Sequence, residues 1–243
     1  MIALVTGSSR GIGKSIICEF ARRGIDVVIN YYKNEDKAKE LEKEIKSKYK
    51  VRVMSISCDV SKEEDVRSMF DKIIDEFGSI DILVNNAGIC RDTMFTDIKV
   101  KEFRRILDVN LIGTYLCSKY AYLYMKEKKK GVIINISSTN AIDTYYPESA
   151  AYDSSKAGVI SLTHNMAVEF APYIRVNCVC PGWVKTDMNK DLSFDQIEEE
   201  KRQILLNRFA DSDEIAKVVV FLASKDASYI NDSIIRVDGG RYN

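Results

Sequence analysis

The sequence predicts a single-domain α/β protein, built on a doubly wound parallel sheet of seven strands with helices on both faces. The chain has 243 residues, which suffices for one sizeable buried core and is short for two domains. Short apolar runs rich in β-branched residues recur along it, and longer stretches with helical periodicity separate them. Strands and helices that alternate in this way form parallel sheets with right-handed crossovers.

Each predicted strand is a continuous apolar run, which is typical of strands buried on both faces. The runs span residues 2–6, 26–31, 51–57, 80–85, 132–137, 174–179 and 233–237. Helical patterns between them include 13–23, 35–48, 63–77 and 154–170. Ser61 and Glu64 have the spacing of a capping box, which would open the third of these helices.

The composition limits the classes of partner. Lys and Arg together number 36, as do Asp and Glu, so the formal net charge is zero and we expect neither nucleic acid nor an anionic membrane as a partner. The six cysteines form no CxxC pair and the chain has one histidine, so we expect no metal site. No apolar run approaches the roughly 20 residues of a membrane span, and no secretory segment is evident. We therefore expect a cytoplasmic protein with reduced thiols.

A glycine-rich turn follows the first predicted strand, in the order Thr-Gly-Ser-Ser-Arg-Gly-Ile-Gly over residues 6–13. Glycines at this place permit a tight turn and let backbone N–H groups approach a pyrophosphate at the N-terminus of a helix. The spacing GxxxGxG differs from the general GxGxxG fingerprint, but its place between a strand and a helix favours dinucleotide binding.

The end of the second strand bears on the choice between NAD and NADP. A NAD site usually carries an acid there for the ribose 2′-hydroxyl, whereas this chain has Asn30, Tyr31 and Tyr32. Arg10 and Lys33 are positioned to face a 2′-phosphate, so NADPH/NADP is the expected cofactor. The alternative is that both cations are simply solvated.

Two further strand ends carry candidate cofactor residues. Asp59 and Val60 close the third strand, where a carboxylate can accept from the adenine amino group. Asn86, Ala87 and Gly88 follow the fourth strand. Small residues and amides at these ends suit the crevice in which open α/β sheets bind ligands.

Tyr152 and Lys156 are four residues apart in a helical segment and share a face. A neighbouring ammonium and an oxidised nicotinamide would lower the pKa of the phenol, so Tyr152 is the candidate proton donor and acceptor. Ser138 ends the fifth strand and is positioned to hold a substrate oxygen. Asn110 lies in an apolar helix, where its amide either binds a water that relays protons to Lys156 or only satisfies local backbone groups.

Taken together, these motifs resemble the short-chain dehydrogenase/reductase family almost from end to end, with Pro181-Gly182 and residues 238–240 completing the pattern. The resemblance implies a Rossmann fold and a catalytic tetrad of Asn110, Ser138, Tyr152 and Lys156. It further implies a homotetramer formed through helices at about 99–126 and 154–170, and a substrate lid at 189–207. The implied cofactor-binding set is Gly7, Ser9, Arg10, Gly11, Ile12, Gly13, Tyr31, Tyr32, Asp59, Val60, Asn86, Ala87, Gly88, Tyr152, Lys156, Pro181, Gly182, Val184 and Thr186.

Within the family, segments 85–92 and 175–188 are most similar to the 3-oxoacyl-(acyl-carrier-protein) reductases of fatty-acid synthesis. That similarity implies NADPH-dependent reduction of a 3-oxoacyl thioester, on a small carrier such as CoA or on acyl carrier protein. An aromatic segment at 145–147 motivates an alternative, a sugar or polyol dehydrogenase. A non-catalytic dinucleotide sensor is a third reading. The basic run at 126–130 either caps a helix or docks an acidic partner.

Overall fold

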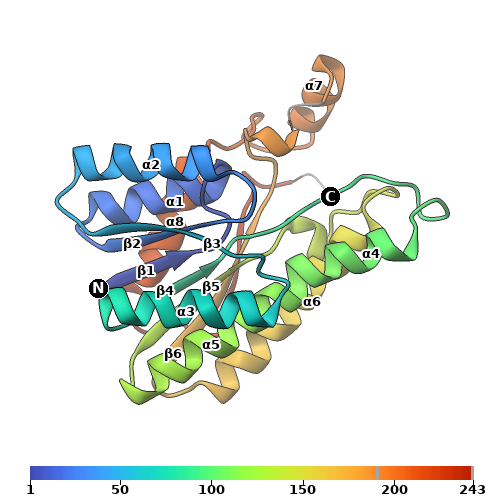
Figure 1. The fold of residues 1–243 in the computed structure, drawn as a ribbon. Coiled ribbons are helices and arrows are strands. Elements are labelled where there is room, and N and C mark those ends of the chain that lie inside the picture. Colours follow the sequence, from blue (N-terminus) through green and yellow to red (C-terminus); the bar gives the residue numbers. More distant parts are fainter. Residues whose placement is uncertain (190–191, 242–243) are drawn as a thin grey trace.

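The computed structural model describes residues 1–189 and 192–241. Its centre is a parallel sheet with the strand order β3-β2-β1-β4-β5-β6-β7 (Figure 1). The strands are β1 (Ile2–Val5), β2 (Asp26–Tyr31), β3 (Val53–Ser57), β4 (Ile82–Asn85), β5 (Gly131–Ile136), β6 (Ile174–Pro181) and β7 (Ile234–Val237). The predicted fold class is confirmed.

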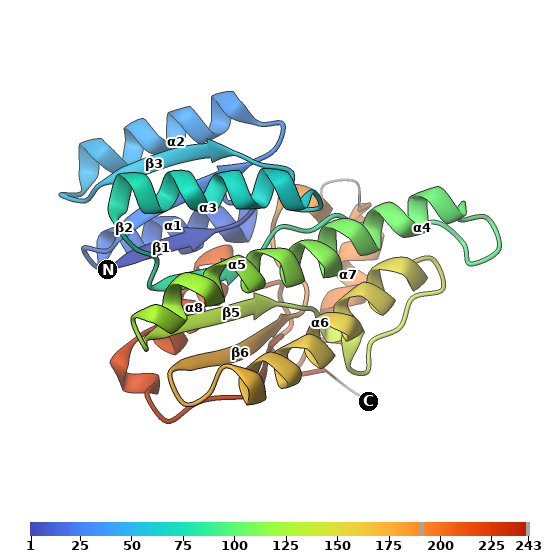
Figure 2. The ribbon, with the colours of Figure 1, turned by 60° about the horizontal axis from the view of Figure 1, so that its bottom comes forward.

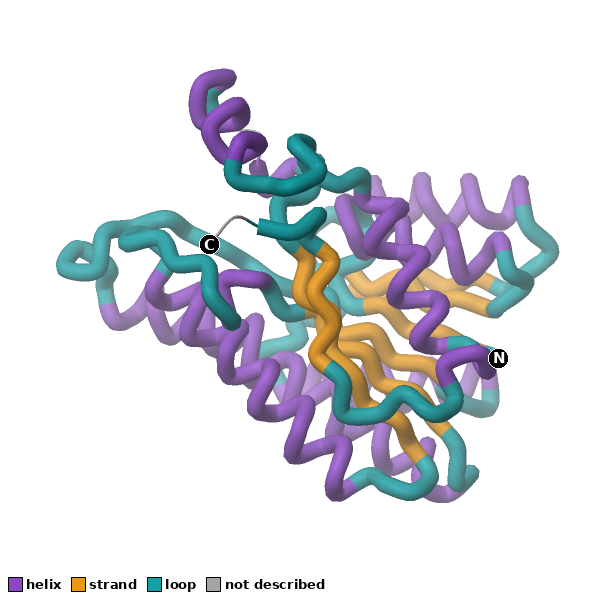
Figure 3. The backbone as a smooth tube through the Cα atoms, turned by 180° about the vertical axis from the view of Figure 1, so that it is seen from behind, coloured by secondary structure: helices purple, strands orange, loops and turns teal. Residues whose placement is uncertain are grey.

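Helices cover both faces of the sheet (Figure 2, Figure 3). One apolar core joins the sheet to α1 (Gly11–Arg22), α2 (Glu35–Lys48) and α8 (Ser212–Ala223). A second core joins its other face to α3 (Glu63–Phe77), α5 (Gly113–Glu127) and α6 (Ala150–Glu169). The alternate residues of a strand point to opposite faces, so the continuous apolar runs feed both cores. α4 (Val100–Leu107) and α7 (Phe194–Arg202) lie beyond the sheet, at its carboxyl end (Figure 1).

Three local predictions were wrong. Strand β3 begins at Val53, not at 51, because the N–H of Arg52 donates to the Asp26 carboxylate at 2.8 Å. The long helix expected at 99–126 contains a π-helical turn at Asp108–Ile112. The capping box at Ser61 is absent, because the Ser61 hydroxyl instead donates to the Asp59 carboxylate at 2.7 Å.

The strand order reverses between β1 and β4, so the helices that follow these two strands lie on opposite faces. A crevice therefore opens at the carboxyl ends of the central strands, where open α/β sheets bind ligands. The polar residues that end β1, β4 and β5 meet at this edge. None of the described helices combines the length and the apolar character needed to cross a membrane.

Candidate active site

The glycine turn packs tightly against the segment that follows β4. Gly7 adopts a left-handed φ of 62°, and a Cβ there would lie 2.9 Å from the Cα of Ala87. A Cβ on Gly13 would lie 2.5 Å from Nδ2 of Asn86 and 2.8 Å from the carbonyl oxygen of Gly7. Side chains are therefore excluded from both positions by neighbouring backbone and by Asn86.

Two residues that sequence reasoning missed hold this turn in place. The Thr6 hydroxyl accepts from the N–H groups of Asn86 and Ala87 at 3.0 and 2.9 Å. The side-chain oxygen of Asn30 accepts from the N–H of Gly7 at 3.0 Å. Asn86 itself donates to the Thr6 carbonyl at 2.8 Å, so its amide braces the turn. Their position at carboxyl strand ends was the signal that could have identified Thr6 and Asn30.

The turn presents the N-terminus of α1 to the crevice. Arg10 is the N-cap residue, no side chain among the described residues caps the helix, and its first turn contains no acid. The first N–H groups of a helix lack intrahelical partners and favour an anion, so these residues fit a dinucleotide pyrophosphate. The side chain of Thr186 comes within 3.7 Å of the Cβ position of Gly11. Ser9 is buried in the turn, and Ile12 packs on the core beneath it.

Beside the turn, two cations share one carboxylate. Arg10 and Lys37 each lie 3.6 Å from the same carboxylate oxygen of Asp187. The ammonium of Lys33, the other cation predicted to face a 2′-phosphate, lies over the ring of Tyr32 at 5.5 Å from its centroid. The contact of Arg10 and Lys37 with Asp187 was not predicted, because Asp187 is distant from both cations in the sequence.

The residues predicted to bind the cofactor at the ends of β2 and β3 differ in burial and in their contacts. Tyr31 is buried in the core, whereas Tyr32 is half exposed. The buried Asp59 carboxylate accepts from Arg105 at 3.1 Å and from the hydroxyl of Ser61. Val60 packs against Gly113, where a Cβ would lie 2.7 Å from it.

Tyr152, Lys156 and Ser138 converge at the carboxyl end of β5. The Lys156 ammonium donates to the carbonyl of Ile136 at 2.8 Å and lies 5.6 Å from the centre of the Tyr152 ring. Burial lowers the pKa of Lys156 to about 8. Burial also raises the pKa of Tyr152, and a hydrogen bond with the Ser138 hydroxyl opposes this in part. Desolvation of the phenolate is the largest of these effects. The lowering of the phenol pKa by a bound oxidised nicotinamide stays a prediction.

Asn110 lies in the π-helical turn and is buried. Its amide accepts from the N–H of Ile89 at 2.8 Å and donates to the Ile89 carbonyl at 2.9 Å and to the hydroxyl of Ser155 at 2.9 Å. A Cβ on Gly88 would lie 3.5 Å from both Oδ1 of Asn110 and Nζ of Lys156, so these two groups flank Gly88. The amide therefore bonds nearby backbone, as one of the two sequence hypotheses stated. The relay of protons through water stays a prediction.

Known proteins resemble this chain over its full length. A family model described as enoyl-(acyl carrier protein) reductase matches residues 7–242. A solved short-chain dehydrogenase/reductase double mutant from Serratia marcescens superposes with a TM-score of 0.93 at 32% identity, over 98% of this chain and 96% of that one. The chain belongs to the short-chain dehydrogenase/reductase family. It is accordingly an oxidoreductase that uses a nicotinamide dinucleotide.

Several curated members of this family have a higher sequence identity to this chain than that solved structure has. The 3-oxoacyl-(acyl-carrier-protein) reductase FabG of Staphylococcus epidermidis is 41% identical over 99% of this chain and 98% of its own length. The enzyme of the same name from Staphylococcus aureus is 42% identical, and that from Aquifex aeolicus is 39% identical, each over 99% of this chain and 97% of its own length.

In this short-chain dehydrogenase/reductase, the segment after β6 connects the crevice to α7. Pro181 ends the strand, the N–H of Gly182 donates to the Val237 carbonyl at 3.2 Å, and Val184 is buried. The indole of Trp183 and the hydroxyl of Tyr146 both donate to one carboxylate oxygen of Glu200, at 2.7 and 2.8 Å.

The contacts of Glu200 involve one residue of the aromatic segment at 145–147, Tyr146. Tyr146 ties the loop between β5 and α6 to helix α7, and the ring of Trp183 stacks on Phe209 with centroids 5.4 Å apart. α7 thus contacts the two segments that frame the crevice. Residues 190–191 of the predicted lid lie outside the described part of the chain.

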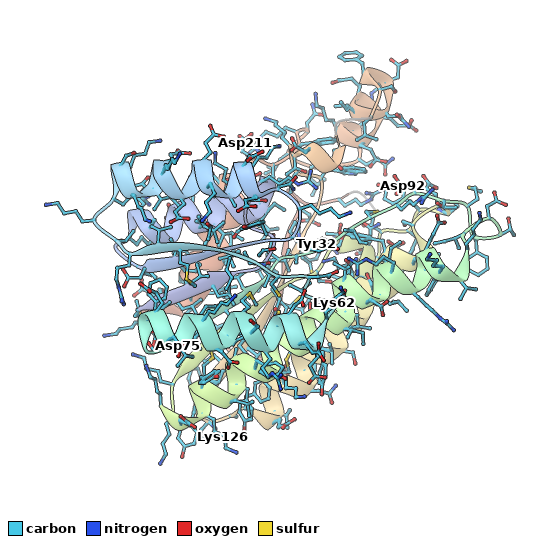
Figure 4. All side chains as sticks on the ribbon, in the orientation of Figure 1. Tyr32, Lys62, Asp75, Asp92, Lys126 and Asp211 are labelled. Carbon is cyan, nitrogen blue, oxygen red and sulfur yellow. The ribbon has the colours of Figure 1, made fainter. Side chains whose placement is uncertain are left out.

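The basic run at 126–130 lies at the far end of the molecule from the crevice, where Figure 4 labels Lys126. The ammonium groups of Lys126 and Lys129 lie over the rings of Tyr122 and Tyr173, at 5.5 and 5.6 Å from their centroids. Both cations therefore have aromatic partners within the chain. The helix cap and the docking of an acidic partner both stay predictions for this run.

Proposed function

We propose that the protein is an NADPH-dependent 3-oxoacyl-thioester reductase, which converts a 3-oxoacyl-(acyl-carrier-protein) to the 3-hydroxyacyl product in fatty-acid synthesis. The observation that carries this proposal is the convergence of Ser138, Tyr152 and Lys156 beside the glycine turn, in a chain about 40% identical over its full length to reductases of that name. Such substrates are soluble and intracellular, so we also propose a cytoplasmic location.

The candidate residues divide into two groups. The first group would hold the dinucleotide and consists of Gly7, Ser9, Gly11, Ile12, Gly13, Asp59, Val60 and the segments 86–88 and 181–186. The bound cofactor would supply hydride to the ketone carbon. The second group carries out the proton transfer. Tyr152 donates its phenolic proton to the carbonyl oxygen as negative charge develops there. Ser138 hydrogen-bonds the same oxygen, and the Lys156 ammonium stabilises the phenolate that remains. Proton transfer needs a phenol that is protonated at neutral pH, which agrees with the raised pKa of Tyr152.

The preference for NADPH is attributed to Arg10 and Lys37, whose shared carboxylate partner marks a place suited to a 2′-phosphate. We expect Arg10→Ala to weaken NADPH binding about tenfold to hundredfold and NADH binding less than about threefold, as for the loss of one charge-assisted hydrogen bond. Fluorescence titration with both cofactors measures this. Arg22→Ala, which removes an exposed guanidinium paired with Glu19 in the last turn of α1, is the matched control. An equal loss for NADH and NADPH would remove Arg10 from phosphate recognition.

The low pKa of Lys156 predicts the pH dependence of the reaction. In the free enzyme this ammonium loses its proton near pH 8, while the raised pKa of Tyr152 keeps the phenol protonated. Because the neutral amine no longer stabilises the phenolate, kcat/KM for NADPH should decrease as pH rises through about 8. This parameter reports groups of the free enzyme. A profile that stays flat from pH 7 to 9.5 would contradict a catalytic ammonium at Lys156.

We propose that segment 189–207 is a substrate lid, because α7 contacts both Trp183 and the 139–149 loop through Glu200. We also propose a homotetramer. Apolar side chains are exposed on the outer surfaces of the two long helices implied by the family, Ile112, Tyr115 and Leu123 near or on α5 and Val168 on α6. A face of this kind favours association with a second copy.

The substrate is tested by following NADPH absorbance with acetoacetyl-CoA and with an acetoacetyl carrier protein. Rapid oxidation that is faster with the carrier protein supports the proposed reaction. Oxidation with CoA alone would make CoA thioesters the substrate. Turnover of glucose or polyols with NADP, and none of either thioester, would replace the proposal by a sugar or polyol dehydrogenase. Cofactor binding with no turnover of any of these would indicate a sensor.

A further inference from the structure

A chain of hydrogen bonds leads from Ser138 to a carboxylate that the reaction does not use. The Ser138 hydroxyl accepts from the N–H of Asn140 at 3.2 Å and donates to Oδ1 of the same residue at 3.2 Å. The amide nitrogen of Asn140 donates to the Asp153 carboxylate at 2.8 Å. The other oxygen of Asp153 accepts from the hydroxyl of Ser149 at 2.6 Å.

We propose that Asn140 and Asp153 are positioning residues, which direct the single hydroxyl proton of Ser138 away from Tyr152 and toward Asn140. This inference rests on the proposed role of Ser138 and Tyr152. It assigns functions to two residues that the family motifs do not include.

The chemistry of the three groups fixes the direction of each bond. An ionised carboxylate only accepts, so Asp153 requires the amide nitrogen of Asn140 to face it. The amide oxygen of Asn140 then faces Ser138, and this oxygen also only accepts. The Ser138 hydroxyl has one proton, which it gives to Asn140. Its lone pairs are left to accept from the phenol of Tyr152.

This arrangement has a consequence for Tyr152. A Ser138 proton directed at the phenolic oxygen would stabilise the phenolate, and the proton of Tyr152 would then be lost more easily. With the Ser138 proton held by Asn140, Tyr152 keeps its own proton, which reduction of a ketone requires. Burial raises the pKa of Tyr152 most, and the Asp153 carboxylate raises it further, as Cys90 and Cys180 would as thiolates. A hydrogen bond donated by Ser138 lowers the pKa of the phenol, and this contribution is lost while Asn140 holds the Ser138 proton. When a substrate binds, its oxygen competes with Asn140 for the Ser138 proton.

Two variants separate the positioning effect from the charge. Asn140→Ala frees the Ser138 hydroxyl without a change of charge, and Asp153→Asn keeps the shape but lets the Asn140 amide reverse. We expect each to move the rising limb of kcat/KM for oxidation of 3-hydroxybutyryl-CoA toward lower pH, and to decrease kcat for reduction about tenfold. Asp71→Asn, which removes a carboxylate that accepts from Tyr124 on the surface, should leave both unchanged.

A measurement without turnover uses protein labelled at Cζ of its tyrosines. The Cζ resonance of Tyr152, assigned by its loss in Tyr152→Phe, should shift in Asn140→Ala and Asp153→Asn but not in Asp71→Asn. An unchanged resonance and an unchanged pH profile in folded Asn140→Ala protein would overturn the proposal, as would a shift in Asp153→Asn alone. If the wild type does not reduce acetoacetyl-CoA, the substrate assignment fails and the resonance still decides the role of Asn140.

Discussion

Tyr152→Phe is expected to lower kcat for thioester reduction at least about 1,000-fold, while NADPH affinity changes less than about threefold. The variant loses one oxygen at the point where Ser138 and Lys156 converge, and no other described side chain there combines a phenolic proton with the required position. The ring remains, so the packing of α6 is preserved. Stopped-flow absorbance with acetoacetyl-CoA measures the rate, and fluorescence titration measures the affinity.

The control for this variant is Tyr229→Phe. Tyr229 is fully exposed and far along the chain from the crevice residues, so its hydroxyl should not affect turnover. If Tyr152→Phe retained more than about a tenth of the wild-type rate, another group would have to be the proton donor, because general acid catalysis contributes about 100-fold or more.

Gly13→Ala is expected to have the second largest effect, a loss of NADPH affinity of about tenfold to hundredfold with a lower melting temperature. Helix propensity alone favours alanine over glycine by about 1 kcal/mol in a helix interior, so it predicts the opposite sign for stability. The steric term should dominate, because the new Cβ would lie 2.5 Å from Asn86 and 2.8 Å from the Gly7 carbonyl. The turn must open to relieve these contacts, and its N–H groups move away from the pyrophosphate.

Gly24→Ala is the matched comparison for Gly13→Ala. Gly24 has a φ of 75° and nothing within 4 Å of its Cβ position, so alanine there is strained without being crowded. We expect Gly24→Ala to decrease stability by about 1–2 kcal/mol and to leave NADPH affinity unchanged. Wild-type affinity in Gly13→Ala would show that the turn tolerates a side chain and that the crowding is relieved elsewhere.

Patterns within short stretches of sequence predicted most of the fold. The apolar runs located every strand to within about two residues, because burial on both faces requires continuous apolar sequence. The one capping signal that was used failed at Ser61, where a carboxylate two residues away competed for the hydroxyl. The π turn at Asn110 also escaped prediction, since nothing in the local pattern distinguishes it from an ordinary helix.

The candidate site was also predicted only in part from the sequence. The sequence by itself determined which residues end the strands, the glycine turn and the shared face of Tyr152 and Lys156, because these depend on neighbours within one element. Only the tertiary structure decided that Asp187 lies between Arg10 and Lys37, and that Asp153 orients Asn140. It also decided the raised pKa of Tyr152. Contacts and desolvation of this kind depend on which elements meet at the crevice, and the order of the strands in the sheet sets that arrangement.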